Sequence, residues 1–245
     1  MEPGTRIPLK EIKRSCENCS LSELCLPYSL PAEEIKQLET IVARQPPLPP
    51  GAHLFNAGAP FRSLYAVRTG SFKVFGVDEA GNEQILGFHF PGDLMGLDAL
   101  AGQHHRCTAE ALENSAVCAV PYTQLETLSM QLPGLHRQMM RIMSREIAHE
   151  GEMLMATGKK QAEARLAGFL VGLSRRMSDR GLSATDFHLP MSRADLGNYL
   201  GLAVETVSRL FTRFQEQGML SVNRKDVRLL DLKALQHMSA PCNDH

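Results

Sequence analysis

Residues 192–214 encode two short helices joined by a glycine turn, and this pattern limits the possible folds more than any other part of the chain. Ser192, followed three positions later by Asp195, predicts a capped helix start, and Gly201 permits a tight turn after that helix. The next helix is expected to open near Val204, with an apolar face of Val207, Leu210, Phe211 and Phe214. This arrangement is typical of proteins that place a helix in the DNA major groove.

The opposite face of the second predicted helix is polar and suits the edges of bases. Arg209 can donate two hydrogen bonds to guanine, Glu205 can accept one from cytosine, and Ser208 can do either. An ordinary pair of helices with a charged surface is the alternative interpretation. The residues that we expect to contact DNA are Glu205, Thr206, Ser208, Arg209 and Arg213.

A hairpin wing is predicted after this helix, and its turn carries Arg224 and Lys225, which suit phosphate contacts. Residues 159–233 hold 13 Lys and Arg against eight Asp and Glu, a net charge of +5, although the whole chain has a net charge of -1. A basic C-terminal part on an acidic body indicates a polyanionic partner. We therefore expect residues 161–245 to form a winged helix-turn-helix domain that binds double-stranded DNA.

Nine glycines between residues 51 and 102 separate short runs of alternating apolar and polar residues, such as 63–67 and 84–88. Short strands punctuated by turn residues predict an antiparallel roll or barrel. We expect this β-roll, as the sensor domain, to occupy residues 30–122, including a short helix near its start.

A long helix is predicted over residues 123–160, and one of its faces has heptad spacing. That face comprises Met140, Met143, Ile147, Glu150 and Leu154. Such a face indicates a seam along which two copies of the helix pair, so we expect a homodimer. The predicted fold class is α+β: an antiparallel β-roll, a long dimerisation helix and a C-terminal winged helix-turn-helix.

Three cysteines, Cys16, Cys19 and Cys25, lie close together in an N-terminal arm of residues 1–29. The first 15 residues lack the apolar run of a secretion signal, and no segment approaches the ~18 apolar residues of a membrane helix. We therefore expect a cytoplasmic protein without a membrane partner, in a compartment where stable disulfides are rare. Closely spaced thiols then predict metal or cluster binding, with a chance group of free thiols as the alternative.

Four segments carry a resemblance to a known family: 16–27, with its three cysteines, 87–94, 138–143 and 197–209. The last contains an E-x-x-S-R motif formed by Glu205, Ser208 and Arg209. Together these segments resemble the Crp/Fnr superfamily of bacterial transcription regulators, in particular its oxygen-sensing FNR/ANR branch. The resemblance runs from residue 16 to about residue 231, nearly the whole chain.

The resemblance implies a [4Fe–4S] cluster whose ligands are the three arm cysteines and one cysteine of the roll, which matches Cys118. Spacing alone does not separate Cys118 from Cys107 as that fourth ligand. The resemblance also implies a DNA site made of an inverted repeat with TTGAT-like half-sites, and a contact with RNA polymerase. Relatives that bind cyclic nucleotides carry a carboxylate where this chain has Leu97, so we expect no cyclic nucleotide to bind.

Two other classes of function are compatible with parts of the sequence. A zinc-stabilised or small-ligand-responsive regulator is one, because zinc is also held by four thiolates. An enzyme is the other, and it is disfavoured because the histidines lack the spacing of a metal-dependent protease or a catalytic triad.

We expect the carboxylate of Glu150, in the predicted seam, to control the association of the two subunits. Two Glu150 side chains ~6 Å apart, at an effective dielectric near 20, repel each other by on the order of 3 kcal/mol, which shifts a dimerisation constant by about 100-fold. We expect the intact cluster to tie the arm to the roll and favour the dimer. When oxygen destroys the cluster, the repulsion separates the subunits, and specific DNA binding is lost with the second recognition helix.

Overall fold

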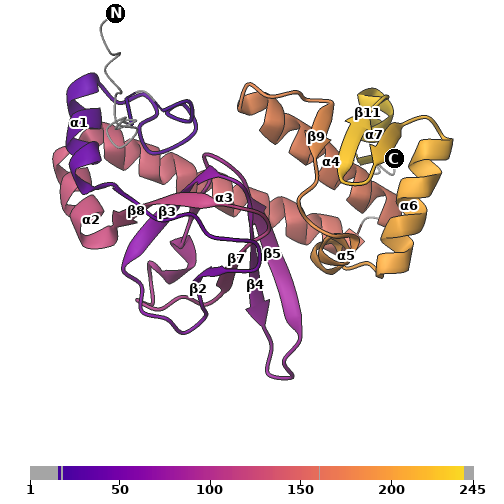
Figure 1. Cartoon of the computed structure of the whole chain (residues 1–245), viewed down its shortest axis with the longest axis horizontal. Helices are drawn as coiled ribbons and strands as arrows, with labels where there is room; N and C mark the ends of the chain where they lie inside the picture. Colours follow the sequence, from indigo (N-terminus) through magenta and orange to yellow (C-terminus); the bar gives the residue numbers. More distant parts are fainter. Residues whose placement is uncertain (1–15, 18, 160, 240–245) are drawn as a thin grey trace, which may run out of the picture.

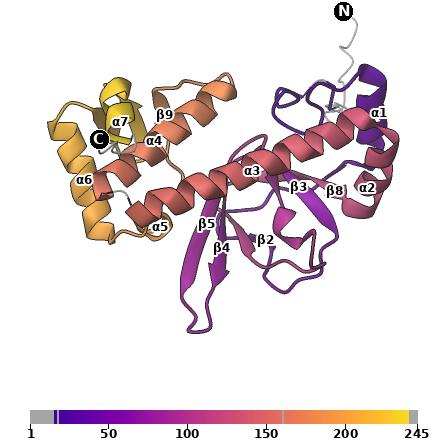
Figure 2. The ribbon, with the colours of Figure 1, turned by 180° about the vertical axis from the view of Figure 1, so that it is seen from behind.

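A computed structural model describes residues 16–17, 19–159 and 161–239, without the side chains of residues 152–159. In this part of the chain one long helix, α3 (Pro133–Lys159), runs along the molecule and connects its two ends (Figures 1 and 2). The cysteine arm, α1 (Ala32–Ile41) and α2 (Tyr122–Gln131) lie at one end of α3. The C-terminal helices, with three short strands of their own, lie at the other end, and the strands of the β-roll lie between the two.

Two four-stranded antiparallel sheets form the β-roll, as the glycine-rich region predicts. Their strand orders are β1-β8-β3-β6 and β2-β7-β4-β5. The strands are β1 (Ala43–Arg44), β2 (His53–Phe55), β3 (Ser63–Thr69), β4 (Phe72–Val77), β5 (Glu83–His89), β6 (Leu94–Met95), β7 (Thr108–Ala111) and β8 (Ala116–Pro121), with a short 3-10 helix, η2 (Leu97–Ala99), after β6. Fully buried Phe72, Ala109 and Val117 fill the space between the sheets, so the roll has its own core.

The single helix that we expect over residues 123–160 is instead two helices. Helix α2 ends at Gln131, and α3 begins at Pro133, because proline fits the first turn of a helix but disrupts its interior. Leu132, between them, has the extended backbone that precedes proline, with φ -115° and ψ 94°. The predicted seam therefore lies on α3 alone. No helix among the described residues is long and apolar enough to cross a membrane.

The C-terminal part is a winged helix-turn-helix, as the sequence predicts. Its elements are α4 (Ala162–Asp179), β9 (Asp186–His188), α5 (Arg193–Leu200), α6 (Val204–Glu216), β10 (Leu220–Asn223), β11 (Asp226–Leu229) and α7 (Leu232–Ser239). The predicted capping box is confirmed, because Ser192 and Asp195 bond each other's backbone N–H groups, and Gly201 ends α5 with a left-handed φ of 64°. Strand β9, which was not predicted, joins the hairpin as a third strand.

The roll and the winged helix-turn-helix are held together by a shared apolar core and by polar contacts. Ile85, Phe88 and Phe90 of the roll pack in one buried cluster with the apolar faces of α4, α5 and α6. Asn198 of α5 accepts a 2.6 Å hydrogen bond from the backbone of Ile85 and donates a 2.7 Å bond to the carbonyl of Glu83. The C-terminal domain is therefore docked on the β4–β5 hairpin rather than tethered only through α3.

A second polar contact in this interface is an aspartate held by two arginines. The carboxylate of Asp93, after β5, accepts hydrogen bonds from Arg176 at 2.5 Å and from Arg180 at 2.6 Å, both on α4. Burial favours a raised pKa for Asp93, but the two guanidinium groups outweigh it and hold the pKa below its usual value. The sequence did not predict these contacts, because each joins segments more than 80 residues apart.

Candidate functional site

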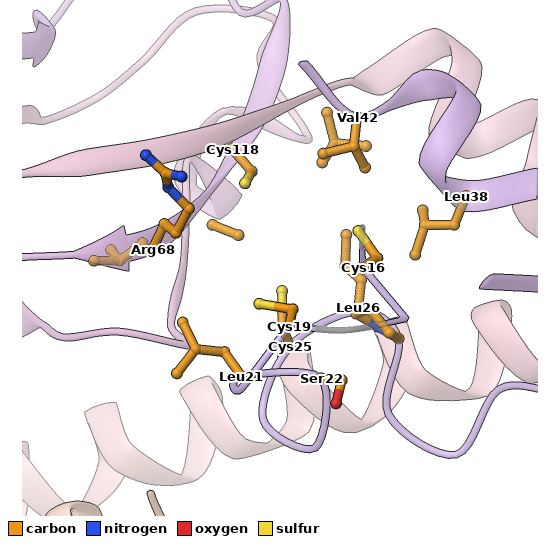
Figure 3. A pocket seen from close by; sticks show the side chains of 14 residues that line it. Cys16, Cys19, Leu21, Ser22, Cys25, Leu26, Leu38, Val42, Arg68 and Cys118 are labelled. Atoms are coloured by element: carbon orange, nitrogen blue, oxygen red, sulfur yellow. The ribbon is translucent and has the colours of Figure 1, made fainter. Parts of the chain in front are cut away.

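The three arm cysteines and Cys118 line one pocket between the arm, α1 and the roll (Figure 3). These four thiols come from segments about 100 residues apart in the sequence. Most other lining residues are apolar, among them Leu21, Leu26, Leu38, Val42 and Val120. Arg68, whose side chain is positively charged, also lines the pocket and lies beside Cys118 (Figure 3).

Local turns in the arm bring its cysteines to this pocket. The backbone N–H of Cys19 bonds to the carbonyl of Cys16, and that of Cys25 bonds to the carbonyl of Leu21, so the segment between them is coiled back on itself. Glu39 on α1 accepts a hydrogen bond from the backbone N–H of Cys16, which attaches the start of the arm to α1. Leu26 anchors the other end of the arm with a side chain that is 2% exposed.

The roll presents Cys118 from a central strand. Strand β8 lies between β1 and β3, and Cys118 stands opposite Arg44 on one side and Ala66 on the other. Cys107 is buried elsewhere, in the core between the two sheets, and does not line the pocket. The structure thus places Cys118, and not Cys107, beside the arm cysteines.

The residues around the pocket fit a metal group held by cysteine sulfur. Four thiolates are the donor set of an iron–sulfur cluster, which places its own core between the cysteines, and also of a structural zinc ion, which needs its sulfur ligands about 2.3 Å from one centre. Among the described residues, no three His, Cys, Asp or Glu side chains are already placed to hold a metal ion. The chemistry of the four thiols therefore fits a cluster, and zinc is the alternative.

Burial controls the protonation of these thiols. It raises the pKa of Cys16 to about 11 and the pKa of Cys25 to about 12. Burial also raises the pKa of Cys118, although the guanidinium groups of Arg68 and Arg44 oppose that rise. Cys16, Cys25 and Cys118 are therefore protonated at neutral pH in the metal-free protein, and they must release protons when a metal group binds.

The arm also contacts the long helix directly, which the sequence did not indicate. Gln138 on α3 is 3% exposed, and its side-chain amide donates a 3.0 Å hydrogen bond to the backbone carbonyl of Cys25. One helical turn later, the guanidinium of Arg141 lies 4.8 Å from the ring centre of Tyr28. Figures 1 and 2 show the arm beside the first half of α3. The cysteine arm therefore contacts the helix that carries the predicted seam.

Three of the four predicted seam residues whose side chains are described are exposed. Met140 is 46% exposed and Ile147 is 70% exposed, and Glu150 is exposed one turn beyond Ile147, whereas Met143 is partly buried. Leu154 belongs to the stretch of α3 whose side chains lie outside the described residues. Large exposed apolar side chains on one helix face are typical of a surface that another protein covers.

The predicted recognition helix, α6, has the two faces that its sequence indicates. Val207, Leu210, Phe211 and Phe214 are all buried. The five predicted DNA contacts are exposed, except for partly buried Thr206, which lies within 3.5 Å of the Arg209 guanidinium. Arg213 bonds to Glu163 of α4 at 2.7 Å, so it must leave that exposed ion pair to reach DNA, at a cost of about 0–1 kcal/mol.

A roll of the cyclic nucleotide-binding type, a long helix with an exposed seam and a winged helix-turn-helix define a class of bacterial transcription regulators. Residues 46–131 match the family model of the cyclic nucleotide-binding domain, and residues 164–238 match that of the Crp-like helix-turn-helix domain. The chain belongs to the Crp/Fnr family, as the sequence analysis predicts.

Similar proteins agree with this assignment. The chain is 51% identical over 216 residues to the transcriptional activator protein Anr of Pseudomonas aeruginosa, with 88% of each chain covered. It is 47% identical over 224 residues to the fumarate and nitrate reduction regulatory protein of Escherichia coli K12, with 91% of this chain and 90% of that protein covered. The solved structure of FixK2 from Bradyrhizobium japonicum has a TM-score of 0.75 and 30% identity, covering 82% of this chain and 98% of that one.

Proposed function

We propose that this protein is an oxygen-responsive transcription regulator that binds a [4Fe–4S] cluster through Cys16, Cys19, Cys25 and Cys118. The observation that carries the proposal is the meeting of these four thiols around one mostly apolar pocket, which is attached to the long helix through Gln138. The similarity to Anr and to the fumarate and nitrate reduction regulatory protein supports it. When bound, the cluster supplies iron–sulfur bonds that are sensitive to oxygen.

The residues of the chain transmit the state of the pocket to α3. Occupied cysteines hold the arm against the roll, and the arm backbone then accepts the hydrogen bond from Gln138. This bond fixes the first half of α3, whose other face carries Met140. Without the cluster, the arm is no longer attached to the roll at Cys118. The arm then no longer constrains the position of α3.

The seam of α3 converts that constraint into dimerisation. Met140, Met143 and Ile147 bury apolar surface against a second copy of the chain, whereas Glu150 faces its own counterpart and opposes pairing. Because the two contributions oppose each other, a change in the position of α3 shifts the equilibrium between monomer and dimer. Only the dimer places two α6 helices on the two halves of an inverted repeat with TTGAT-like half-sites.

Other partners follow from the same proposal. RNA polymerase is the expected protein partner of the DNA-bound dimer, and the cytoplasm, where bacterial DNA is found, is the expected location. Cyclic nucleotide is not expected to bind, because the Asp98 carboxylate already accepts the backbone N–H of Arg106 at 2.7 Å and would repel a phosphate there.

The experiment that tests this function compares Cys118→Ser with Cys107→Ser after purification without oxygen. We expect the wild type and Cys107→Ser to be brown, with about four iron and four sulfide per chain, and Cys118→Ser to lose both. Colourless wild-type protein that contains zinc would favour the zinc-stabilised regulator instead. Equal iron in the two serine variants would refute Cys118 as a ligand.

A further inference from the structure

A β-bulge directs one arginine into the cysteine pocket. The pairing of β3 with β8 shifts register between Val67 and Thr69, which leaves Arg68 as an extra residue without a partner on β8. Bulges interrupt the alternation of a strand and re-aim a side chain. Here the bulge lies two residues beyond Ala66, the partner of Cys118, and Arg68 lines the pocket beside that cysteine (Figure 3).

The Nε–H group of Arg68 is buried and has no hydrogen-bond partner among the described residues. A buried donor without an acceptor is costly, and more so when it carries charge, so nearly all such groups in folded proteins are paired. The pocket that Arg68 lines is mostly apolar, and in such surroundings a positive charge attracts an anion far more strongly than in water. The unpaired donor therefore indicates an anionic acceptor that occupies this pocket.

We propose that Arg68 is a positioning residue of the cysteine pocket, whose buried Nε–H donates to the anionic group that the four cysteines hold and whose charge stabilises that group. The inference rests on the proposed function, because it takes an iron–sulfur cluster as the occupant. Four thiolates carry more negative charge than the iron–sulfide core offsets, so the ligated group is an anion. Hydrogen bonds to sulfur and nearby charge are known determinants of cluster stability and potential.

Arg44 provides a matched control for this proposal. It stands directly opposite Cys118 on β1 and carries the same charge, but its side chain is exposed. Water and salt screen an exposed charge, so Arg44 contributes less than a buried donor to the stability of a group in the pocket. A comparison of Arg68 with Arg44 therefore separates a buried, directed donor from positive charge in general.

The test measures cluster retention in the full-length protein. Wild type, Arg68→Met, Arg68→Lys and Arg44→Met are loaded with iron and sulfide without oxygen and then exposed to an iron chelator. We expect Arg68→Met to shorten the half-life of the cluster by about tenfold or more, and Arg68→Lys and Arg44→Met to shorten it less. We also expect the midpoint potential of Arg68→Met to become more negative, because loss of a positive charge disfavours the reduced cluster.

Each result has a definite meaning for the proposal. A half-life and midpoint potential of Arg68→Met equal to those of the wild type would overturn it, as would an equal loss in Arg44→Met. The proposal is also wrong if Arg68→Lys loses its cluster as fast as Arg68→Met and both variants, in their metal-free form, melt at a lower temperature than the metal-free wild type. In that case the arginine acts through packing. Wild type that retains no iron would overturn the proposed function itself, and the role of Arg68 with it.

Discussion

The side-chain amide of Gln138 donates a 3.0 Å hydrogen bond to the backbone carbonyl of Cys25, and this bond joins the cysteine arm to the long helix. Gln138 is nearly fully buried, so the bond is shielded from water. Two residues later Met140 lies on the exposed seam of the same helix. The contact is therefore a direct route from the cysteine pocket to the surface that we expect to pair in the dimer.

Gln138→Leu is expected to weaken the oxygen-free dimer. The substitution leaves the Cys25 carbonyl without its donor, at a cost of about 1–3 kcal/mol, and frees α3 from the arm. We expect the dimer dissociation constant to rise by roughly 5- to 150-fold in sedimentation measurements without oxygen. Gln131→Leu, at the exposed end of α2, is the control. Equal dissociation constants for the two variants would show that the contact does not transmit the state of the arm.

Gly92→Ala is expected to detach the arm from the roll. Gly92 has a φ of 95°, and an added Cβ would lie 2.8 Å from the Cβ of Leu24 in the arm. Backbone strain of this kind costs about 1–3 kcal/mol, and the clash adds to it. We expect faster proteolysis within the arm of the metal-free protein. Gly81→Ala shares the positive φ of 84° but has no atom within 4 Å, so a similar rate for both variants would mean that close packing on Leu24 is unimportant.

Local patterns in the sequence were sufficient to predict the elements that depend on neighbouring residues. The capping box of Ser192 and Asp195, the buried face of α6 and the grouping of three arm cysteines all arise within short segments. Pro133 indicates the break between α2 and α3, but the long helical periodicity of the apolar residues favoured the prediction of a single helix. The glycines and the alternating runs predicted the roll but not the order of its strands.

Contacts between distant segments could not be predicted in the same way. Gln138 is a polar residue in a helix, and nothing near it in sequence indicates that it bonds to Cys25, 113 residues away. Arg68 lies in an ordinary strand pattern, and only the register shift against β8 reveals that it lines the pocket. The choice of Cys118 over Cys107 likewise depends on which strand lies beside the arm, which is a property of the assembled sheet.

Arg209→Ala is expected to weaken DNA binding in a sequence-dependent way. Its guanidinium is exposed on α6, and we expect it to donate two hydrogen bonds to one guanine, so its loss should cost about 1–3 kcal/mol and relax the preference at one base pair. Arg224→Ala, in the wing turn, is expected to remove a phosphate contact and to weaken binding to all sequences alike. Affinities for an inverted repeat and its single-base variants distinguish the two effects. Uniform loss in Arg209→Ala would contradict base reading by this residue.

His89 is expected to make folding of the metal-free protein sensitive to acid. Burial lowers its pKa to about 4, Arg176 and His149 add to that effect, and Asp93 opposes it. The unfolded chain, with a pKa near 6.5 at this residue, therefore binds more protons between pH 6.5 and about 4. The free energy of unfolding should fall as pH drops through this window, by at most about 1.4 kcal/mol per pH unit.

Urea unfolding at several pH values measures this effect of His89. We expect His89→Gln to flatten the pH dependence across the window, whereas His136→Gln, at an exposed position of α3, keeps the slope of the wild type. An unchanged slope in His89→Gln would assign the acid sensitivity to other groups.

The most direct test of the central claim is the mass of the protein in solution before and after exposure to air, measured by sedimentation equilibrium on one oxygen-free preparation. We expect a dimer that becomes a monomer in air, and we expect Glu150→Ala to remain a dimer because the repulsion across the seam, on the order of 3 kcal/mol, is gone. A wild type whose mass does not change in air, or a Glu150→Ala variant that still dissociates, would contradict the account.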